Sequence, residues 1–422
     1  MPRPALGIDF GTSNTAAAVW ADGKPRVLAL DPKAIDARLF RSVLFFPDEG
    51  HVISGAEAIA AYLEQADGRF LQSLKTFLPI QSFVSTAIKH RPFTLEALLA
   101  LIIHAVKASV ERELGEKVDR LVLGRPARFS EDPQVDAFAE RRLRRAAEEA
   151  GFKDIHFRIE PLAAGLSHES TLDHDELVLT ADFGAGTSDF TVVRLSPARH
   201  RQPDRSKDVL ASAGVYVGGD RIDGAIMEKK LLQYFGAHAI QRPMGLGAGV
   251  GMPSHLLRKL LSWHTMSFIR DRSTQQFLED FLRTTDDPAG IGAFIDLVNH
   301  NLGYHLFRAI EAAKVELSTR QKTHLSFHDA RVNIEVDLTR REFEAMIAPL
   351  VEQLVGAIDT VLSKAGIAAK DIDTVVLTGG TSLIPAIGKI FESRFAPEKL
   401  HRADAFSSVA EGLAVAAMSL DA

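Results

Sequence analysis

One motif that occurs twice constrains this chain more than any other feature. An apolar run ends in Asp9-Phe10-Gly11 and continues, after hydroxyl and amide residues at 12–14, into a second apolar run. Much later, another apolar run ends in Asp182-Phe183-Gly184 and again continues into a second run. Two short apolar runs joined by a glycine-containing turn are typical of a β-hairpin. The repetition predicts two related lobes.

The two lobes are expected to share more than this hairpin. A buried strand at 121–124 leads to Arg125-Pro126, and a buried strand at 375–378 leads to Gly379-Gly380. The order strand, turn, strand, long segment, strand and helix therefore occurs twice. The second copy is longer, and its additional residues coincide with a mainly helical stretch at 220–318. We expect an α/β protein whose two lobes face each other across a cleft, with a helical subdomain inserted in the second lobe.

Local patterns predict further elements. Apolar residues spaced by three and four predict a helix at 95–114, and a second helix is expected at 134–150. Capping boxes at Thr339–Glu342 and Ser408–Glu411 predict the starts of two more helices. The helix at 134–150 has a basic face, interpreted as solvent-exposed, with a docking patch as the alternative. The arginines of this face are Arg141, Arg142, Arg144 and Arg145.

Composition excludes several classes of function. The 422 residues contain 49 Lys and Arg against 55 Asp and Glu, which argues against nucleic acid as a partner. The absence of cysteine excludes disulfides, zinc ribbons and thiol catalysis. No H-E-x-x-H motif is present, and His324 and His328 are expected to be ordinary polar residues of a hairpin. Without an apolar leader or a long uninterrupted apolar run, we expect a cytoplasmic protein with no membrane partner.

The repeated turns have the chemistry of phosphate sites. Glycine accepts a positive φ at low cost and has no Cβ, so backbone N–H groups can approach a ligand closely. Successive N–H donors, together with Thr and Ser hydroxyls, suit phosphate oxygens. Two aspartates at the ends of facing strands suggest a shared hydrated Mg²⁺, which prefers few carboxylates, several waters and substrate phosphates.

These motifs resemble the nucleotide-binding domain of the seventy-kilodalton heat-shock chaperones (DnaK type), within the actin-like ATPase superfamily. In type, the chain is similar to the YegD-like chaperone-like proteins. The carrying motifs are the first phosphate loop (7–14), the first connecting helix (159–166), the second phosphate loop (181–189), the adenosine motif (376–385) and the second connecting helix (408–417). The resemblance covers almost the whole chain.

The resemblance implies an α/β fold of duplicated actin-like ATPase (ribonuclease H-like) lobes around a central nucleotide cleft. The first lobe would span 1–175 with a subdomain inserted at about 32–115. The second would span 176–422 with a helical subdomain inserted at about 216–320. No peptide-binding domain is expected, so classical client binding is not predicted.

The resemblance also implies roles for individual residues. Mg²⁺ would be held, mainly through water, by Asp9 and Asp182. The phosphates of ATP or ADP would contact the two turns, at Gly11, Thr12, Ser13 and Asn14 and at Gly184, Ala185, Gly186 and Thr187. Catalysis would depend on Lys75, Glu160, Asp182, Thr187 and Asp189. The adenosine would be surrounded by Gly218, Gly219, Glu311, Lys314, Ser318, Gly379 and Gly380.

Some of these assignments have alternatives. Lys75 could instead be a solvated surface lysine, and Glu160 a carboxylate favoured by a helix N-terminus. Glu311 and Lys314 could form a surface pair one turn apart. The family's two adenine-stacking arginines are replaced here, and the middle glycine of its second phosphate loop is also changed. The residues at these three places are Val315, Leu383 and Ala185.

The function implied is that of an ATP-binding, ATP-hydrolysing chaperone-like protein, whose nucleotide-driven cleft closure signals to a partner protein. The three changed positions keep open a nucleotide-sensing scaffold with weak or no hydrolysis. A small-molecule kinase of the same superfamily is a further alternative, although no motif assigns its general base or substrate pocket. A filament-forming relative of actin is the last, and the oligomeric state is left open.

Overall fold

The computed structural model describes residues 6–65, 68–169, 172–199, 205–241, 249–402, 407–418 and 420. The chain forms two compact units. The first contains Met1–Tyr216, Val355–Ser382 and Lys389–Ala422, and the second contains Val217–Leu354 and Leu383–Gly388. The boundaries predicted for the two lobes divide the chain by a different criterion and stay a prediction.

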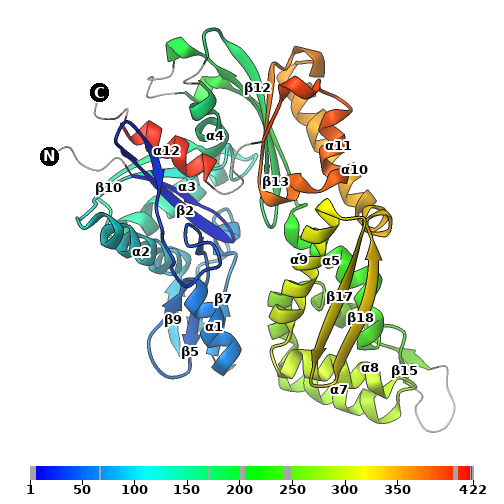
Figure 1. Ribbon diagram of the computed structural model, residues 1–422. Coiled ribbons are helices and arrows are strands. Elements are labelled where there is room, and N and C mark those ends of the chain that lie inside the picture. Colours follow the sequence, from blue (N-terminus) through cyan, green and yellow to red (C-terminus); the bar gives the residue numbers. More distant parts are fainter. Residues whose placement is uncertain are drawn as a thin grey trace. The chain divides into compact units, whose positions relative to one another are not determined.

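The first unit contains a sheet built from the N-terminal part of the chain (Figure 1). Its strands are β1 (Leu6–Phe10), β2 (Asn14–Ala21), β3 (Lys24–Val27), β4 (Phe40–Arg41), β10 (Arg120–Arg125) and β11 (Asp154–Ile159). The main order is β11-β10-β1-β2-β3, and β4 pairs with β2. β1, β2 and β3 form an antiparallel meander, whereas β10 is parallel to β1 and β11 to β10. The predicted opening meander is confirmed.

A second sheet in the same unit repeats this topology. Its strands are β12 (Glu176–Phe183), β13 (Ser188–Leu195), β14 (Val209–Val215), β19 (Thr374–Thr378) and β20 (Leu400–Arg402). Their order is β14-β13-β12-β19-β20, with an antiparallel meander followed by two parallel strands. These five strands correspond one by one to the main path of the first sheet, and only β4 has no counterpart among the described strands, so the predicted duplicated α/β fold is confirmed.

Each sheet is covered by the helix that follows the other sheet. The helix α4 (Glu160–Glu169) follows β11, yet its Leu162 lies in a buried cluster with second-sheet residues Val178, Val193, Leu195 and Val376. The helix α12 (Ser408–Met418) follows β20, yet its alanines pack on first-sheet alanines, in the cluster Ala16, Ala18, Ala410 and Ala414. In Figure 1, the red α12 lies across the blue strands β1 and β2. Because each of these two helices packs on the sheet that it does not follow in the chain, the two sheets are interlocked.

Close backbone approach makes this interlock possible. A Cβ on Gly412 of α12 would lie 1.8 Å from the carbonyl oxygen of Ala163 in α4. A Cβ on Gly7 of β1 would lie 2.5 Å from the backbone nitrogen of Ala414. Real Cβ atoms do not approach other atoms so closely, so glycine is required at both places for steric reasons.

The segment between β4 and β10 adds smaller elements to the first unit. They are β5 (Leu44–Pro47), β6 (Ile53–Ser54), α1 (Gly55–Gln65), β7 (Gly68–Leu71), the 3-10 helix η1 (Leu74–Phe77), β8 (Ser85–Ile88), β9 (Arg91–Thr94) and α2 (Leu95–Leu114). The helix α2 has the predicted bounds: Thr94 accepts a hydrogen bond from the Ala97 N–H at 3.2 Å, and Gly115 ends the helix at φ 73°. The helix α3 (Pro133–Glu149) then packs against α2.

The second unit is mainly helical, as predicted. Its helices are α5 (Gly219–Ile226), α6 (Ser254–Lys259), α7 (Arg272–Thr284), α8 (Pro288–Asn299) and α9 (Gly303–Thr319), and short strands β15 (Ile240–Gln241) and β16 (Val250–Gly251) pair with each other. A long hairpin follows, formed by β17 (Lys322–Asp329) and β18 (Val332–Thr339). One face of this hairpin is buried and the other is exposed.

The unit boundary falls within α10 (Arg340–Ala365). Its predicted capping box is confirmed, because the Thr339 N–H donates to Glu342 at 3.0 Å and the Glu342 N–H donates to the Thr339 hydroxyl at 3.2 Å. By length and composition α10 could cross a membrane. However, its large apolar side chains, including Phe343, Ile347 and Leu354, are buried within the protein. This is the pattern of a core helix.

The predicted solvated face of α3 is wrong for two of its four arginines. Arg142 is 5% exposed. Arg144 donates to the Ile155 carbonyl at 2.8 Å and stacks on the Phe157 ring. Arg145, which pairs with Glu149 at 3.1 Å, and Arg141 are exposed as expected. The sequence pattern marks the helix as amphipathic but does not show which arginines face the protein.

Candidate functional site

The first aspartate of the repeated motif lies near the end of β1. Asp9 is partly buried and stands opposite Ala16 in the β1–β2 register. The turn that follows is tight, since a Cβ on Gly11 would lie 2.3 Å from the Asn14 carbonyl oxygen. Gly11 does not have a positive φ, so glycine is needed here for close approach and not for a left-handed backbone.

Three more predicted phosphate contacts lie in this turn. Thr12, Ser13 and Asn14 are all partly buried. The Asn14 side-chain oxygen accepts a hydrogen bond from Arg41 at 3.0 Å, and the Ser13 carbonyl accepts one from the Ser42 N–H at 3.0 Å. The short strand β4 and its continuation therefore hold the turn in place, a role that sequence reasoning did not assign.

The second aspartate occupies the corresponding place on β12. Asp182 stands directly opposite Asp189 in the β12–β13 register. The turn between them is closed by the Gly184 N–H, which donates to the Thr187 carbonyl at 2.9 Å. The Thr187 hydroxyl donates to Asp189 at 3.1 Å. The structure thus brings together Asp182, Thr187 and Asp189, which the sequence assigned to one site.

Ala185 and Gly186 complete this turn, and both are partly buried. Neither Gly184 nor Gly186 has a positive φ. A Cβ on Gly186 would meet nothing within 4 Å, so the turn itself has space for a side chain there. Ala185 does not have a positive φ either, so an alanine at this position fits the backbone of the turn without strain.

The end of β19 lies beside Asp182. The Thr378 hydroxyl donates to the Asp182 carboxylate at 2.7 Å, consistent with the parallel pairing of these two residues. Gly379 follows with φ +84°, and a Cβ there would lie 2.1 Å from the Phe183 carbonyl oxygen. Here glycine is required both by conformation and by space. Gly380 then begins the 3-10 helix η8 (Gly380–Leu383).

Lys75 and Glu160 form an ion pair in the same region. The Lys75 ammonium lies 2.9 Å from the Glu160 carboxylate, and the two side chains are only 12% and 13% exposed. The alternative of a solvated surface lysine is therefore wrong. Glu160 is the first residue of α4, so the helix-terminus interpretation and the ion pair hold together.

The pKa shifts show that these groups form one electrostatic cluster. Burial, followed by repulsion from Glu160, raises the pKa of Asp9 to about 8, and Lys75 opposes the shift. Burial, followed by repulsion from Asp182, raises the pKa of Asp189 to about 7. The pKa of Asp182 is also raised, by burial first, although the hydrogen bond from Thr378 opposes this.

This cluster suits a divalent cation. Glu160 repels all three shifted aspartates, Asp182 repels both Asp9 and Asp189, and Lys75 is the cation that acts on all three. Crowded carboxylates with raised pKa values bind a positive ion favourably, because the ion removes their mutual repulsion. In the part of the chain that the structure describes, no three His, Asp or Glu side chains are close enough to coordinate one metal directly. Contact of Mg²⁺ with Asp9 and Asp182 through water stays a prediction.

The predicted adenosine residues fall mostly in the second unit and are described within it. Gly218 and Gly219 begin α5. Lys314, on α9, lies 2.9 Å from Asp223 of α5, with both side chains nearly buried at 13% and 11% exposure. Burial raises the pKa of Asp223 to about 6, and Lys314 opposes the shift. Lys314 is therefore held in place by a carboxylate that sequence reasoning missed.

Glu311 and Lys314 do not pair with each other, so the surface-pair alternative is wrong. Glu311 pairs instead with Arg308 at 2.7 Å, in an exposed position. The Ser318 hydroxyl donates back to the Lys314 carbonyl at 3.1 Å within α9. The two apolar replacements are exposed, Val315 by 60% and Leu383 by 52%.

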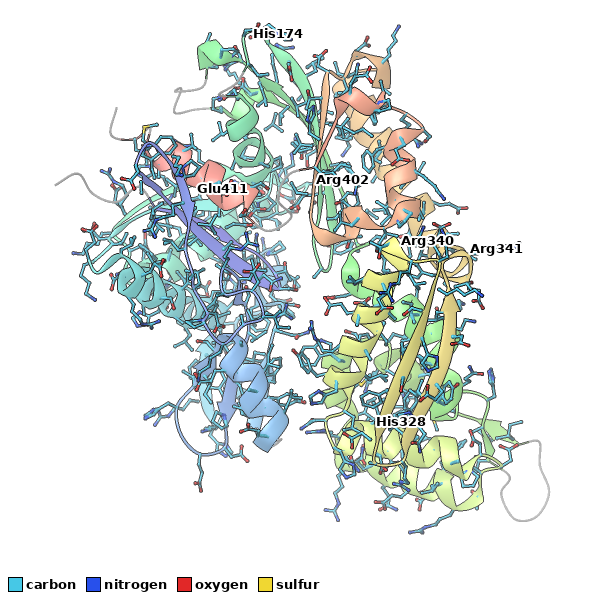
Figure 2. The ribbon with its side chains drawn as sticks, viewed as in Figure 1. His174, His328, Arg340, Arg341, Arg402 and Glu411 are labelled. Carbon is cyan, nitrogen blue, oxygen red and sulfur yellow. The ribbon has the colours of Figure 1, made fainter. Side chains whose placement is uncertain are left out.

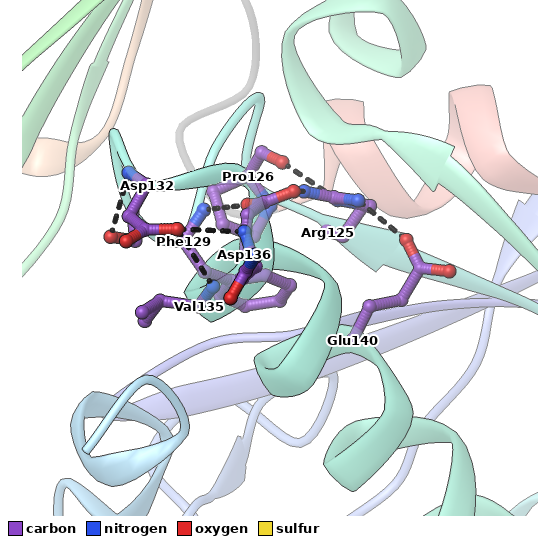
Figure 3. A network of polar contacts seen from close by, with 9 residues as sticks. Arg125, Pro126, Phe129, Asp132, Val135, Asp136 and Glu140 are labelled. Atoms are coloured by element: carbon purple, nitrogen blue, oxygen red, sulfur yellow. Dashed lines mark hydrogen bonds and ion pairs between the residues drawn. The ribbon is translucent and has the colours of Figure 1, made fainter. Parts of the chain in front are cut away.

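The segment after β10 is fixed by a polar network (Figure 3). Arg125 contacts both carboxylate oxygens of Asp136, at 2.7 and 2.8 Å, and one of Glu140 at 2.5 Å. Its Nε also donates to the Pro126 carbonyl at 3.1 Å, and Asp136 accepts from the Phe129 N–H at 2.6 Å. Arg125 thus ties the Pro126 turn to α3.

Two of the contacts that sequence reasoning missed had a signal in the chain. Thr378 immediately precedes the Gly379-Gly380 pair and ends its predicted strand, just as Asp182 lies near the end of its own apolar run. Asp223 lies four residues after Gly219, which the resemblance assigned to the adenosine site. The partners of Arg142 and Arg41 lie on segments that are distant in sequence, so no local pattern predicts these contacts.

The duplicated sheets, the exchanged connecting helices and the paired aspartates define a member of the actin-like ATPase superfamily. A family model described as Hsp70 protein matches residues 5–242 and 288–422. The chain therefore belongs to the Hsp70 family, whose members are ATP-binding chaperones with ATPase activity. The match leaves 243–287 uncovered and does not distinguish the predicted subtype, which stays a prediction.

Proposed function

We propose that this chain binds Mg²⁺–ATP at the cluster around Lys75 and hydrolyses it to ADP and phosphate. The observation that carries the proposal is that Asp9 and Asp182, one from each copy of the repeated hairpin, act on each other and on the same Lys75–Glu160 pair. Family membership supports nucleotide binding, and the cluster supports the metal-dependent chemistry.

The roles follow from charge and position. Asp9 and Asp182 would hold Mg²⁺ through its waters, and the ion would neutralise charge on the β- and γ-phosphates. The backbone N–H groups and hydroxyls of the two turns bind phosphate oxygens. Lys75 supplies a positive charge to the γ-phosphate, and Glu160 fixes the direction of the ammonium. Asp189, held by Thr187, is the carboxylate available to orient water.

The proposal extends to what the nucleotide does. A ligand that contacts both turns binds a closed arrangement better than an open one, so it shifts the population toward closure. We propose that a partner protein reads this change. A cytoplasmic location is part of the same proposal.

Turnover by the purified full chain tests the proposed function. We expect the protein to hydrolyse ATP only in the presence of Mg²⁺. We expect Asp9→Asn and Asp182→Asn each to abolish this hydrolysis. The matched control is Asp48→Asn, which changes an exposed aspartate outside the cluster. Thr187→Ala is expected to slow turnover more than it weakens ATP binding.

The same assay separates the alternatives. Transfer of phosphate to an added sugar instead of water would favour a small-molecule kinase, and binding without turnover would favour a scaffold. If neither ATP nor ADP alters the melting temperature and no turnover occurs, the proposed function is wrong.

A further inference from the structure

A buried guanidinium makes an unusual set of contacts beside the segment that carries Lys75. Arg142, on α3, donates to three backbone carbonyls: Phe77 at 3.4 Å, Ile80 at 3.2 Å and Phe83 at 3.0 Å. Its Nε donates to the Glu96 carboxylate at 2.7 Å. The Arg142 side chain is only 5% exposed, and all three of its guanidinium nitrogens donate hydrogen bonds to the protein.

The three carbonyls belong to one irregular stretch that begins directly after Lys75. Lys75 lies in the single-turn helix η1, and the Leu78 N–H donates to the Lys75 carbonyl at 3.2 Å. Further turns follow, with the Ile80 N–H donating to Phe77 and the Phe83 N–H to Ile80. A chain of isolated turns has few internal hydrogen bonds, so contacts from outside set its conformation.

Apolar packing also holds the stretch around Lys75, but it does not by itself fix the direction in which the Lys75 side chain points. Leu74 and Leu78 flank Lys75 and are almost fully buried in the core of the first sheet. Such contacts are non-directional, and they allow the backbone to rotate about them. Hydrogen bonds to carbonyls restrict that rotation. The Lys75 ammonium needs a fixed direction, because it meets Glu160 at 2.9 Å.

The contacts require arginine. A guanidinium presents five donors in a planar fork, whereas an ammonium presents three on a compact centre. Glu96 supplies the counter-charge: burial acts to raise the pKa of Glu96, but the hydrogen bond from Arg142 lowers it overall. This pairing makes it possible to bury a cation beside neutral carbonyls.

We propose that Arg142 is a positioning residue for Lys75, holding the backbone of residues 77–83 so that the ammonium stays directed at Glu160. The role of Lys75 toward the γ-phosphate rests on the proposed function. The clamp itself does not depend on a nucleotide and can be tested in the protein alone.

The first test measures the reactivity of Lys75 without nucleotide. The full chain is treated with a limiting acetylating reagent, and acetylation at each lysine is followed by mass spectrometry. We expect slow modification of Lys75 in the parent protein and at least a roughly tenfold increase in Arg142→Lys, because an ammonium cannot replace the fork. The matched control is Arg145→Gln on the same helix, whose side chain is 72% exposed.

Two further variants separate the clamp from general unfolding. Glu96→Gln removes the counter-charge of the buried Arg142 but keeps an acceptor for it, so Lys75 should become more reactive than in the parent protein and less reactive than in Arg142→Lys. Exposed lysines, such as Lys117 at 90%, report on the reagent and should not change in any variant. If Lys75 stays protected in both Arg142→Lys and Arg142→Gln while these remain folded by circular dichroism, the proposal is wrong. If a variant unfolds, Arg142→Lys at reduced temperature gives the decisive comparison.

The second test uses a double-mutant cycle on turnover. If Arg142 acts through Lys75, Arg142→Lys lowers kcat in the parent protein but has no further effect in a Lys75→Met background. Equal effects in both backgrounds would overturn the proposal. A parent protein without turnover would count against the proposed function instead, whereas the acetylation result would still decide the role of Arg142.

Discussion

The substitution Gly412→Ala tests the interlock that brings the two aspartates into one cluster. The new Cβ would lie 1.8 Å from the Ala163 carbonyl oxygen, whereas real contacts stay above 3.0 Å. The helices α4 and α12 would therefore have to separate by about 1.2 Å, in a core packed as densely as an organic crystal. Overpacking of this kind costs about 1–3 kcal/mol. Alanine recovers about 0.5–1 kcal/mol through its better helix propensity.

We expect a net loss of about 1 kcal/mol, seen as a fall of about 2–4 °C in the melting temperature followed by circular dichroism. Midpoints are the proper comparison, since a chain of this size is not expected to unfold in one step. The matched control is Gly165→Ala on α4, whose Cβ would meet only the flexible end of Leu195 at 3.0 Å. That variant should change the melting temperature by less than about 2 °C. If Gly412→Ala melts at or above the parent temperature, the two helices are not interlocked as described.

Two further predictions concern single groups. Thr378→Val removes the hydroxyl that donates to Asp182 at 2.7 Å, so the pKa of Asp182 should rise further and Mg²⁺-dependent ATP binding should weaken about fivefold by calorimetry; unchanged affinity would contradict the role of this hydrogen bond. On the outer face of the β17–β18 hairpin, where Figure 2 labels His328, hydrogen bonding raises the pKa values of two histidines. The partners are Asp337 and then Glu335 for His324, and Asn333 and then Glu335 for His328. Bonds from His328, Ser326 and His324 lower the pKa of Glu335 to about 2. The two histidines stabilise the folded hairpin fully below pH 6.5, and this stabilisation is lost as the pH rises through their raised pKa values. Glu335 stabilises the hairpin fully above pH 4.5, and this stabilisation is lost as the pH falls toward its lowered pKa of about 2. Amide exchange of 322–339, corrected for intrinsic rates, should be slowest between these limits, and equal protection at pH 5.5 and 8.5 would contradict this.

Much of the fold could be predicted from the sequence, because it depends on local patterns. The hairpins at Asp9 and Asp182, the helix α2 and the strand β19 have apolar spacing and turn residues that act within a few positions. The strands β11 and β20 were missed. The strand β11 alternates polar and apolar residues, so its signal was present and was overlooked, whereas β20 has only three residues and too little sequence to show a period. The predicted box at Ser408 is displaced, because the helix already includes Ser408 and the Ser407 hydroxyl contacts Glu411 at 3.3 Å.

The site was predictable where chemistry and spacing coincide, and not where distant segments meet. Paired aspartates on repeated hairpins indicate a metal and phosphate site from residue type alone. The burial of Lys75 against Glu160 depends on how η1 packs near the start of α4. The spacing of apolar residues in the sequence does not predict such a contact between distant segments. The burial of Arg142 was equally unpredictable from the sequence. Arg142 and Arg145 lie three residues apart on α3, yet the first is buried and the second is exposed.

The most direct test of the central claim is calorimetric binding of ATP with and without Mg²⁺, in the parent protein and in the double variant Asp9→Asn, Asp182→Asn. If the two hairpins share one hydrated cation, Mg²⁺ should tighten ATP binding in the parent by at least about tenfold and have no effect in the double variant. Exposed Asp48→Asn should behave like the parent. An equal effect of Mg²⁺ on the parent and the double variant would contradict the account.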